Sequence, residues 1–146
     1  MCMQEVGLCK WDDFQGDHNY IWVKATGGMA AVVVPRGLGE RVLKQEVRKR
    51  VTGARVSNMI VVSAYLPCNS ENHSIDEYEA TLIEATEVVE ALRRRGGRYI
   101  VLGGDLQVQL PPNVHGLTGP MALGRPRTNR HCAQMRAHLY AFFNKF

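Results

Sequence analysis

The sequence predicts a single domain of mixed α/β class. Its 146 residues, 45% of them hydrophobic, can form one core but not two domains of ordinary size. A capped helix lies between two apolar strand-like stretches, and two further stretches of this kind precede them. Because the sequence has no internal repeat and no low-complexity segment, we expect all of these elements to belong to one α/β body.

The clearest element is a helix expected from Ser74 to Arg95. Ser74 and Glu77 form the S-x-x-E pattern of a capping box at its start, and Gly96-Gly97 supplies a left-handed end. The helix presents one apolar face at spacings of three and four residues, made by Tyr78, Leu82, Ala85, Val89 and Leu92. We expect this face to be buried against a sheet.

Four apolar stretches predict strands. Residues 59–65 (MIVVSAY) and 98–102 flank the helix, which gives a strand, helix, strand unit. Residues 20–24 (YIWVK) and 28–34 (GMAAVVV) surround a Thr26-Gly27-Gly28 turn and predict a hairpin. The second strand of this hairpin is apolar enough to be buried on both faces.

Two further segments are less clearly defined. Residues 40–55 fit either a helical stripe or the alternation of strands, and the sequence leaves this open. After Asp105 the chain is loop-like through residue 127. Residues 131–146 then predict a terminal helix with three apolar side chains on one face, namely Met135, Leu139 and Phe142.

Composition and charge give weak functional information. The formal net charge is +4, and basic residues cluster at 48–50, 93–95 and 125–136, which favours polyanionic partners. Cations in the last turn of a helix also complement its dipole, so the cluster at 93–95 fits a structural role.

No apolar run is long enough to span a bilayer, and no signal-like start is present. With four cysteines that lack metal-site spacing, we expect a reduced intracellular protein, nuclear or cytoplasmic, without membrane association.

Candidate functional residues lie where predicted strands end. Residues 99–108 (YIVLGGDLQV) form an apolar strand that leads through two glycines to one carboxylate, Asp105, and then to the amide of Gln107. Gln4-Glu5 near the start adds a second acid, and Tyr65-Leu66-Pro67 follows another strand. An acid at the end of a buried strand has the rigid support that a group orienting a reacting water requires.

In their order and spacing these motifs resemble the signatures LQE(T), YxP(N) and GGDFN of the endonuclease/exonuclease/phosphatase superfamily. The resemblance is strongest to endonuclease domains of non-long-terminal-repeat retrotransposons and to craniofacial development protein 2-like sequences, and it covers nearly the whole chain. It implies a DNase I-like four-layer α/β/β/α sandwich, of which residues 1–146 are a partial domain. It also implies Mg²⁺-dependent hydrolysis of phosphodiesters or phosphomonoesters.

The resemblance assigns roles to four residues. Glu5 matches the metal ligand, and one glutamate is an adequate anchor for Mg²⁺, or for Mn²⁺ in its place, because Mg²⁺ keeps several waters. Asp105 matches the aspartate that orients or deprotonates the attacking water. Tyr65 matches a tyrosine whose hydroxyl donates to an oxygen near the scissile phosphate, and Gln107 matches the asparagine of GGDFN.

The chain departs from the family pattern in several places. The extra methylene of Gln107 displaces its amide enough to disturb phosphate positioning, and Cys68 stands where YxPN has its asparagine. The family's amino-terminal strand and its terminal Ser-Asp-His region do not fall within these residues. We therefore expect an endonuclease fragment of retroelement kind that binds nucleic acid, DNA rather than RNA, and is inactive as this isolated chain.

Other interpretations remain open. The chain could be a noncatalytic module whose degenerate sheet holds nucleic acid or another protein through basic loops. It could also be a phosphatase of soluble phosphoesters, which would share the same site. At the level of single residues, Tyr65 also fits a core tyrosine, and Asp105 also fits an ordinary turn residue.

Overall fold

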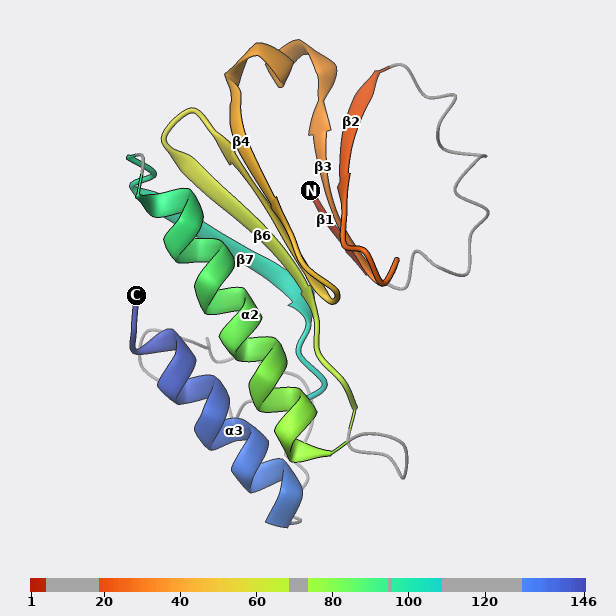
Figure 1. Cartoon of the computed structure of the whole chain (residues 1–146), viewed down its shortest axis with the longest axis vertical. Coiled ribbons are helices and arrows are strands. Elements are labelled where there is room, and N and C mark those ends of the chain that lie inside the picture. Colours follow the sequence, from red (N-terminus) through yellow and green to blue (C-terminus); the bar gives the residue numbers. More distant parts are fainter. Residues whose placement is uncertain (5–18, 69–73, 95, 109–129) are drawn as a thin grey trace, which may run out of the picture.

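The computed structural model describes residues 1–4, 19–68, 74–94, 96–108 and 130–146. Within them the chain forms a mixed α/β structure with two β-sheets and two α-helices (Figure 1). The first sheet contains β1 (Cys2–Gln4), β2 (Tyr20–Lys24) and β3 (Ala30–Pro35), in the order β1-β3-β2. Both of its pairings are antiparallel, so the predicted hairpin of residues 20–34 is confirmed as β2 and β3.

A short 3₁₀ helix, η2 (Arg36–Arg41), connects the first sheet to the second. The second sheet contains β4 (Val42–Val47), β5 (Val51–Val56), β6 (Met59–Tyr65) and β7 (Tyr99–Asp105), in that order. The pairings among β4, β5 and β6 are antiparallel, whereas β6 and β7 are parallel. Residues 40–55 therefore follow the strand alternative, and the helical stripe is not used.

The predicted central helix is confirmed as α2 (Ile75–Arg93). Ser74 is its N-cap, and the Ser74 hydroxyl accepts a hydrogen bond from the Glu77 backbone N–H at 3.2 Å. After the helix, Gly96 adopts a φ of 102°, the left-handed conformation that a glycine supplies without steric cost. All five side chains of the predicted apolar face are buried.

The terminal helix, α3 (Arg130–Phe143), is also confirmed and packs beside α2. Its three predicted core side chains, Met135, Leu139 and Phe142, join the apolar face of α2 and the helix-facing side of the second sheet in one hydrophobic core. The parallel pair β6–β7 is joined through α2, which is the usual crossover for parallel strands. The two helices therefore cover one face of the second sheet (Figure 1).

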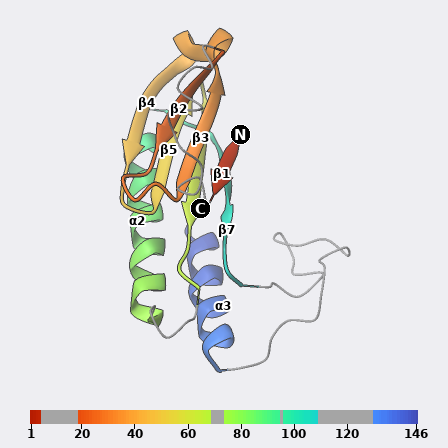
Figure 2. The same ribbon diagram turned by 90° about the vertical axis from the view of Figure 1, so that its right-hand side faces the viewer.

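The other face of the second sheet packs against the first sheet. A second hydrophobic core lies between the sheets, with Val23, Val32 and Val34 on one side and Ala54 and Val56 on the other. The described residues thus form three layers, helices, sheet and sheet, which lie from left to right in Figure 1. Figure 2 looks onto the first sheet, with the second sheet behind it. A fourth layer, as in the four-layer sandwich that the family resemblance implies, is not present among the residues described.

Strand β3 is buried on both faces, as its continuous apolar sequence predicts. Val32 and Val34 point into the space between the sheets, and Ala31 and Val33, which alternate with them, are equally buried.

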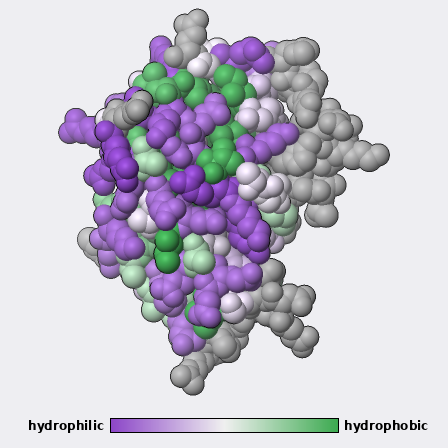
Figure 3. Space-filling view, viewed as in Figure 1, coloured by the Kyte–Doolittle hydropathy of each residue, from purple (hydrophilic) through white to green (hydrophobic). Residues whose placement is uncertain are grey.

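The surface seen in Figure 3 is mostly hydrophilic, with smaller hydrophobic areas. Among the helices that the structure describes, none combines the length and the hydropathy needed to cross a membrane.

Candidate active site

The strands β1, β6 and β7 finish at the same end of the two-sheet stack, the lower end in Figure 1, where β2 and β4 finish too. β6 and β7 are parallel, and their last residues, Tyr65 and Asp105, are direct partners in the register. β1 packs across β6 and β7, and the Cys2 thiol donates to the Val62 carbonyl at 3.3 Å. Since β1 runs antiparallel to β3, its last residue, Gln4, lies toward this end too. The fold therefore gathers the ends of three strands that are far apart in sequence.

Tyr65 and Asp105 are side by side on the face of the second sheet that looks toward the first sheet. Ile60 and Val62 of β6, and Ile100 and Leu102 of β7, pack on the helix side, so the alternate residues point the other way. Both Tyr65 and Asp105 are half-buried. Neighbouring backbone hydrogen bonds fix them, because Tyr65 N–H donates to the Arg50 carbonyl at 3.0 Å and Leu66 N–H donates to the Asp105 carbonyl at 3.0 Å.

Gln107 folds back onto Asp105. The Gln107 backbone N–H donates to Asp105 Oδ1 at 3.1 Å, and Gln107 Nε2 donates to Asp105 Oδ2 at 2.5 Å. Gln107 adopts a φ of 52°, a left-handed conformation that is uncommon for a residue with a side chain. Both oxygens of the carboxylate therefore accept a hydrogen bond from the same residue.

The glycines before Asp105 have a packing role. A Cβ atom on Gly103 would lie 2.7 Å from Cys2 Cβ and 2.8 Å from Cys2 Sγ, where β1 crosses β7. A Cβ on Gly104 would collide with the backbone carbonyl of Ala64 in the neighbouring strand. Burial raises the pKa of the Cys2 thiol in this contact, against the opposing effects of the amino terminus and of the Gly103 backbone. The two glycines thus let β1 and β6 approach β7 closely.

Helix α2 holds the segment that follows Asp105. The hydroxyl of Tyr78, in the first turns of α2, donates to the Leu106 carbonyl at 3.1 Å. Tyr78 is 1% exposed, and desolvation raises the pKa of its hydroxyl well above the ordinary range. The spacing of apolar residues predicts that Tyr78 lies on the buried face of the helix, but nothing in the sequence indicates that its hydroxyl holds the residues next to the candidate acid.

A basic turn, residues 48–50, lies at this end of the molecule as well. Its backbone carbonyls receive hydrogen bonds from both sheets: Thr26 N–H donates to Arg48 O at 2.9 Å, and Gly27 N–H donates to Lys49 O at 2.8 Å. The Arg50 carbonyl receives the hydrogen bond from Tyr65 described above. The sequence shows this basic cluster, but only the pairing of β5 with β6 brings it beside Tyr65.

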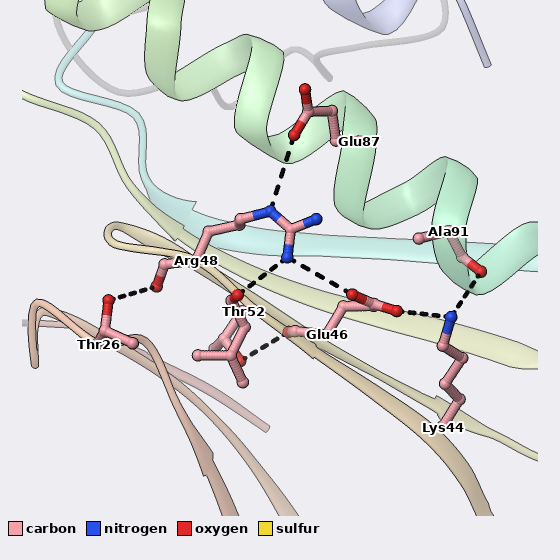
Figure 4. Close-up of polar contacts among 8 residues, drawn as sticks. Thr26, Lys44, Glu46, Arg48, Thr52, Glu87 and Ala91 are labelled. Carbon is pink, nitrogen blue, oxygen red and sulfur yellow. Dashed lines mark hydrogen bonds and ion pairs between the residues drawn. The ribbon is translucent and has the colours of Figure 1, made fainter.

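Side chains around the basic turn form a network between β4 and α2 (Figure 4). The Arg48 guanidinium lies 3.5 Å from Glu46 Oε2 and 3.7 Å from Glu87 Oε2 of α2. Lys44 Nζ lies 2.6 Å from Glu46 Oε1 and also donates to the Ala91 carbonyl of α2 at 3.5 Å. Arg48 is therefore neutralised in part by Glu46 and Glu87, whereas Lys49 is exposed to solvent.

The structure brings together three of the four residues singled out from the sequence, namely Tyr65, Asp105 and Gln107. Glu5, the fourth, directly follows β1 but lies outside the described residues.

Mg²⁺ in proteins is often bound by one or two carboxylates, with water molecules as its other ligands. The Asp105 carboxylate therefore fits a role at such an ion. Among the residues that the structure describes, no group of three or more His, Cys, Asp and Glu side chains could hold a metal ion by itself.

No protein-family model matches this chain, and no curated protein matches it either. The geometry of Tyr65, Asp105 and Gln107 and the motifs that contain them therefore indicate what this end of the molecule can do.

Proposed function

We propose that this chain carries part of a Mg²⁺-dependent phosphodiesterase site of the endonuclease/exonuclease/phosphatase type, of retroelement origin, that acts on nucleic acid. The observation that carries the proposal is the pairing of Tyr65 with Asp105 at the end where β1, β6 and β7 finish together. In this arrangement Asp105 accepts a proton from, or orients, an attacking water. The Tyr65 hydroxyl donates to a phosphate oxygen.

The basic turn supports nucleic acid as the partner. Lys49 is exposed, and its backbone is hydrogen-bonded next to the backbone that holds Tyr65. A polynucleotide whose phosphate lies at Asp105 would bring its neighbouring phosphates to this turn, where cations replace condensed counterions. A soluble phosphomonoester has no such neighbouring phosphates, so the turn favours a polymeric substrate over a small one.

The layer arrangement is compatible with the four-layer sandwich of this superfamily. Two sheets pack face to face, and helices cover the outer face of the second sheet. The remaining helix layer of such a sandwich would lie on the face of the first sheet that carries Ala31 and Val33, both of which are buried.

We further propose that this chain alone does not cleave DNA at a detectable rate. Gln107 stands where the family pattern has asparagine, and it occupies both oxygens of Asp105. Gln107 therefore competes with a water for Asp105, and loss of one well-placed polar group at a reacting centre costs about 10²- to 10³-fold in rate.

Metal binding tests the proposal without relying on catalysis. We expect Mn²⁺ or Mg²⁺ to bind weakly, in the millimolar range of about 4 kcal/mol, and to raise the melting temperature by mass action on the folded state. Glu5→Gln and Asp105→Asn should each abolish this shift, whereas Glu90→Gln, on the exposed side of α2, should keep it. An unchanged shift in both site variants would contradict the proposed metal role.

A cleavage assay separates the remaining alternatives. Abasic, nicked and plasmid DNA and a soluble aryl phosphate are incubated with the chain and Mg²⁺ or Mn²⁺. Metal-dependent DNA nicking that is lost in Asp105→Ala would show that the proposed inactivity is wrong and the site is competent. Hydrolysis of the aryl phosphate alone would assign the site to a phosphatase of soluble phosphoesters.

A noncatalytic nucleic-acid-binding module is a second candidate, and the basic turn together with the occupied carboxylate favours it. Its distinguishing property is DNA binding that weakens with salt and does not change when divalent ions are removed. We expect Lys49→Gln to weaken such binding, and Arg41→Gln, in η2 at the opposite end of the molecule, to leave it nearly unchanged. Binding that requires Mg²⁺ and Asp105 would favour the phosphodiesterase site instead.

A further inference from the structure

Strand β7 is the last strand in the order of the second sheet. Among the residues that the structure describes, it pairs with β6 alone, and Tyr99 and Val101 are 56% and 46% exposed. An edge strand offers alternate backbone N–H and C=O groups to another extended chain. The outer side of β7 is therefore suited to receive a further strand.

A hollow of about 430 Å³ lies beside this edge, between β7 and the carboxyl-terminal parts of α2 and α3. Ile100 and Leu102 of β7 line it from the sheet side. The opposite side is lined by three aromatic rings, in which Phe142 contacts Phe143 and Phe146 edge-on with centroids 5.5 and 5.4 Å apart. A volume of this size is in the range of binding pockets and admits apolar side chains of a partner.

The charged side chains that line the hollow are both cationic. Arg93, at the end of α2, and Arg98, just before β7, line it and are exposed, and the Arg98 guanidinium lies 5.9 Å from the centre of the Tyr99 ring. The residues that line the hollow include no aspartate or glutamate, and residues 130–146, which contain α3, have none either. An occupant that brings apolar groups and negative charge would complement this surface.

These charges argue against a second copy of the chain as the occupant. If two β7 edges paired antiparallel, Arg98 of one copy would lie near the end of β7 in the other, where Asp105 points to the face away from the hollow. A second copy would therefore bring no acidic side chain of β7 to Arg93 and Arg98 in the hollow.

We propose that the β7 edge and the adjoining hollow bind an extended segment of a partner protein that has apolar residues at alternate positions and acidic residues at the end beside the start of β7. The segment adds to β7 as a new strand through backbone hydrogen bonds. Because side chains alternate along a strand, every second residue of the segment faces the hollow between β7 and α3. Apolar residues among these contact Ile100 and Leu102, and an acidic residue beside the start of β7 reaches Arg93 and Arg98. This binding site is separate from the Asp105 end of β7 and does not depend on the phosphodiesterase proposal.

Synthetic peptides test the proposal directly on the whole chain. The first is a short fluorescein-labelled peptide with valine or phenylalanine at alternate positions and glutamates at one end. The second replaces every glutamate with lysine, and the third keeps the glutamates but carries N-methyl groups on alternate backbone nitrogens along one edge. Fluorescence anisotropy should show saturable binding of the first peptide and at least about tenfold weaker binding of the other two.

Variants of the chain locate the binding surface. Arg93→Gln with Arg98→Gln should weaken binding of the acidic peptide about tenfold, and Phe143→Ala should also weaken it. Arg41→Gln removes one cation from η2, next to the opposite edge of the same sheet, and should leave the affinity within about twofold. Thermal melts of each variant confirm that the fold is kept.

The peptide comparison decides the proposal even if a variant fails to fold. Equal binding of the lysine peptide would overturn the charge argument, and equal binding of the methylated peptide would overturn strand addition. Absence of binding of the acidic peptide up to about 1 mM would reject the site altogether. Self-association of the chain that blocks the peptide would assign the edge to a second copy, which also contradicts the proposal.

Discussion

Gln107 and Asp105 form a closed pair in which one residue satisfies both oxygens of the other. The Gln107 backbone N–H reaches Oδ1 at 3.1 Å and its side-chain nitrogen reaches Oδ2 at 2.5 Å. The left-handed φ of 52° at Gln107 is what turns the chain back after β7. The two hydrogen bonds offset the conformational cost of that turn, so the candidate acid and the segment after it stabilise each other.

Removing the Asp105 carboxylate should therefore destabilise the chain as well as alter the site. We expect Asp105→Ala to lower the free energy of unfolding by about 1 kcal/mol, because the half-buried carboxylate accepts two hydrogen bonds. Urea denaturation measures the change, and Glu90→Ala, on the exposed side of α2, serves as the control. A loss no larger than that of the control would mean that the pair does not stabilise the fold.

The contact between Gly103 and Cys2 predicts that the stability of the fold depends strongly on the size of the side chain at position 103. Gly103→Ala should destabilise by about 2 kcal/mol, because its Cβ would overlap Cys2 where β1 crosses β7. Gly37→Ala is the matched control, since no atom lies within 4 Å of the Cβ that it would add. Chemical denaturation of both variants checks the difference.

A second substitution separates the contact from a general intolerance of alanine in β7. Cys2→Gly removes the atoms that a Cβ at Gly103 would strike, so the double variant should be more stable than the sum of the two single changes predicts. Strict additivity of the two changes would show that Gly103 is required for another reason.

Tyr78 predicts a specific loss of stability in alkaline solution. Desolvation raises the folded-state pKa of its hydroxyl, so the unfolded chain releases this proton first, near the ordinary value of about 10. The stabilising contribution is full below that pH and is lost as the pH rises toward the folded-state pKa. Urea unfolding from neutral pH to pH values above about 10 should show a steeper decline for the wild-type chain than for Tyr78→Phe.

At neutral pH, Tyr78→Phe should cost about 1 kcal/mol, since it leaves the Leu106 carbonyl without its donor. Parallel pH profiles for the wild-type chain and Tyr78→Phe would contradict the assignment of the alkaline loss to this hydroxyl.

For Glu46 we expect the opposite dependence of stability on pH, namely a loss of stability in acid. The hydrogen bond from Lys44 is the largest of the effects that lower the pKa of the Glu46 carboxyl. Its stabilising contribution is therefore present above the unfolded-state pKa and is lost as the pH falls through the lower folded-state value. Compared with Glu46→Gln, the wild-type chain should lose more stability between neutral pH and about pH 3, as measured by urea unfolding. Added salt should reduce the difference, because these side chains are partly exposed.

Local patterns sufficed for some elements and not for others. The capping residue and one-sided apolar spacing located α2, and a β-branched run located β6 with the bounds observed in the structure. β7 continues through Gly103 and Gly104 to Asp105, beyond the predicted end at residue 102. Glycines usually indicate a turn, but here β1 and β6 approach so closely that only glycine fits.

By itself, the sequence determined the mixed α/β class, the hairpin of β2 and β3, the unit of β6, α2 and β7, and the apolar faces of both helices, because each depends on residues close together in the chain. Only the tertiary structure decided that residues 42–47 and 51–56 form strands, because the sequence of residues 40–55 fits a helical stripe as well as strands until β5 pairs with β4 and β6. The tertiary structure also placed Tyr65 beside Asp105, set the basic turn next to them and left β7 at an edge. These relationships join residues distant in sequence, and sheet packing rather than local propensity creates them.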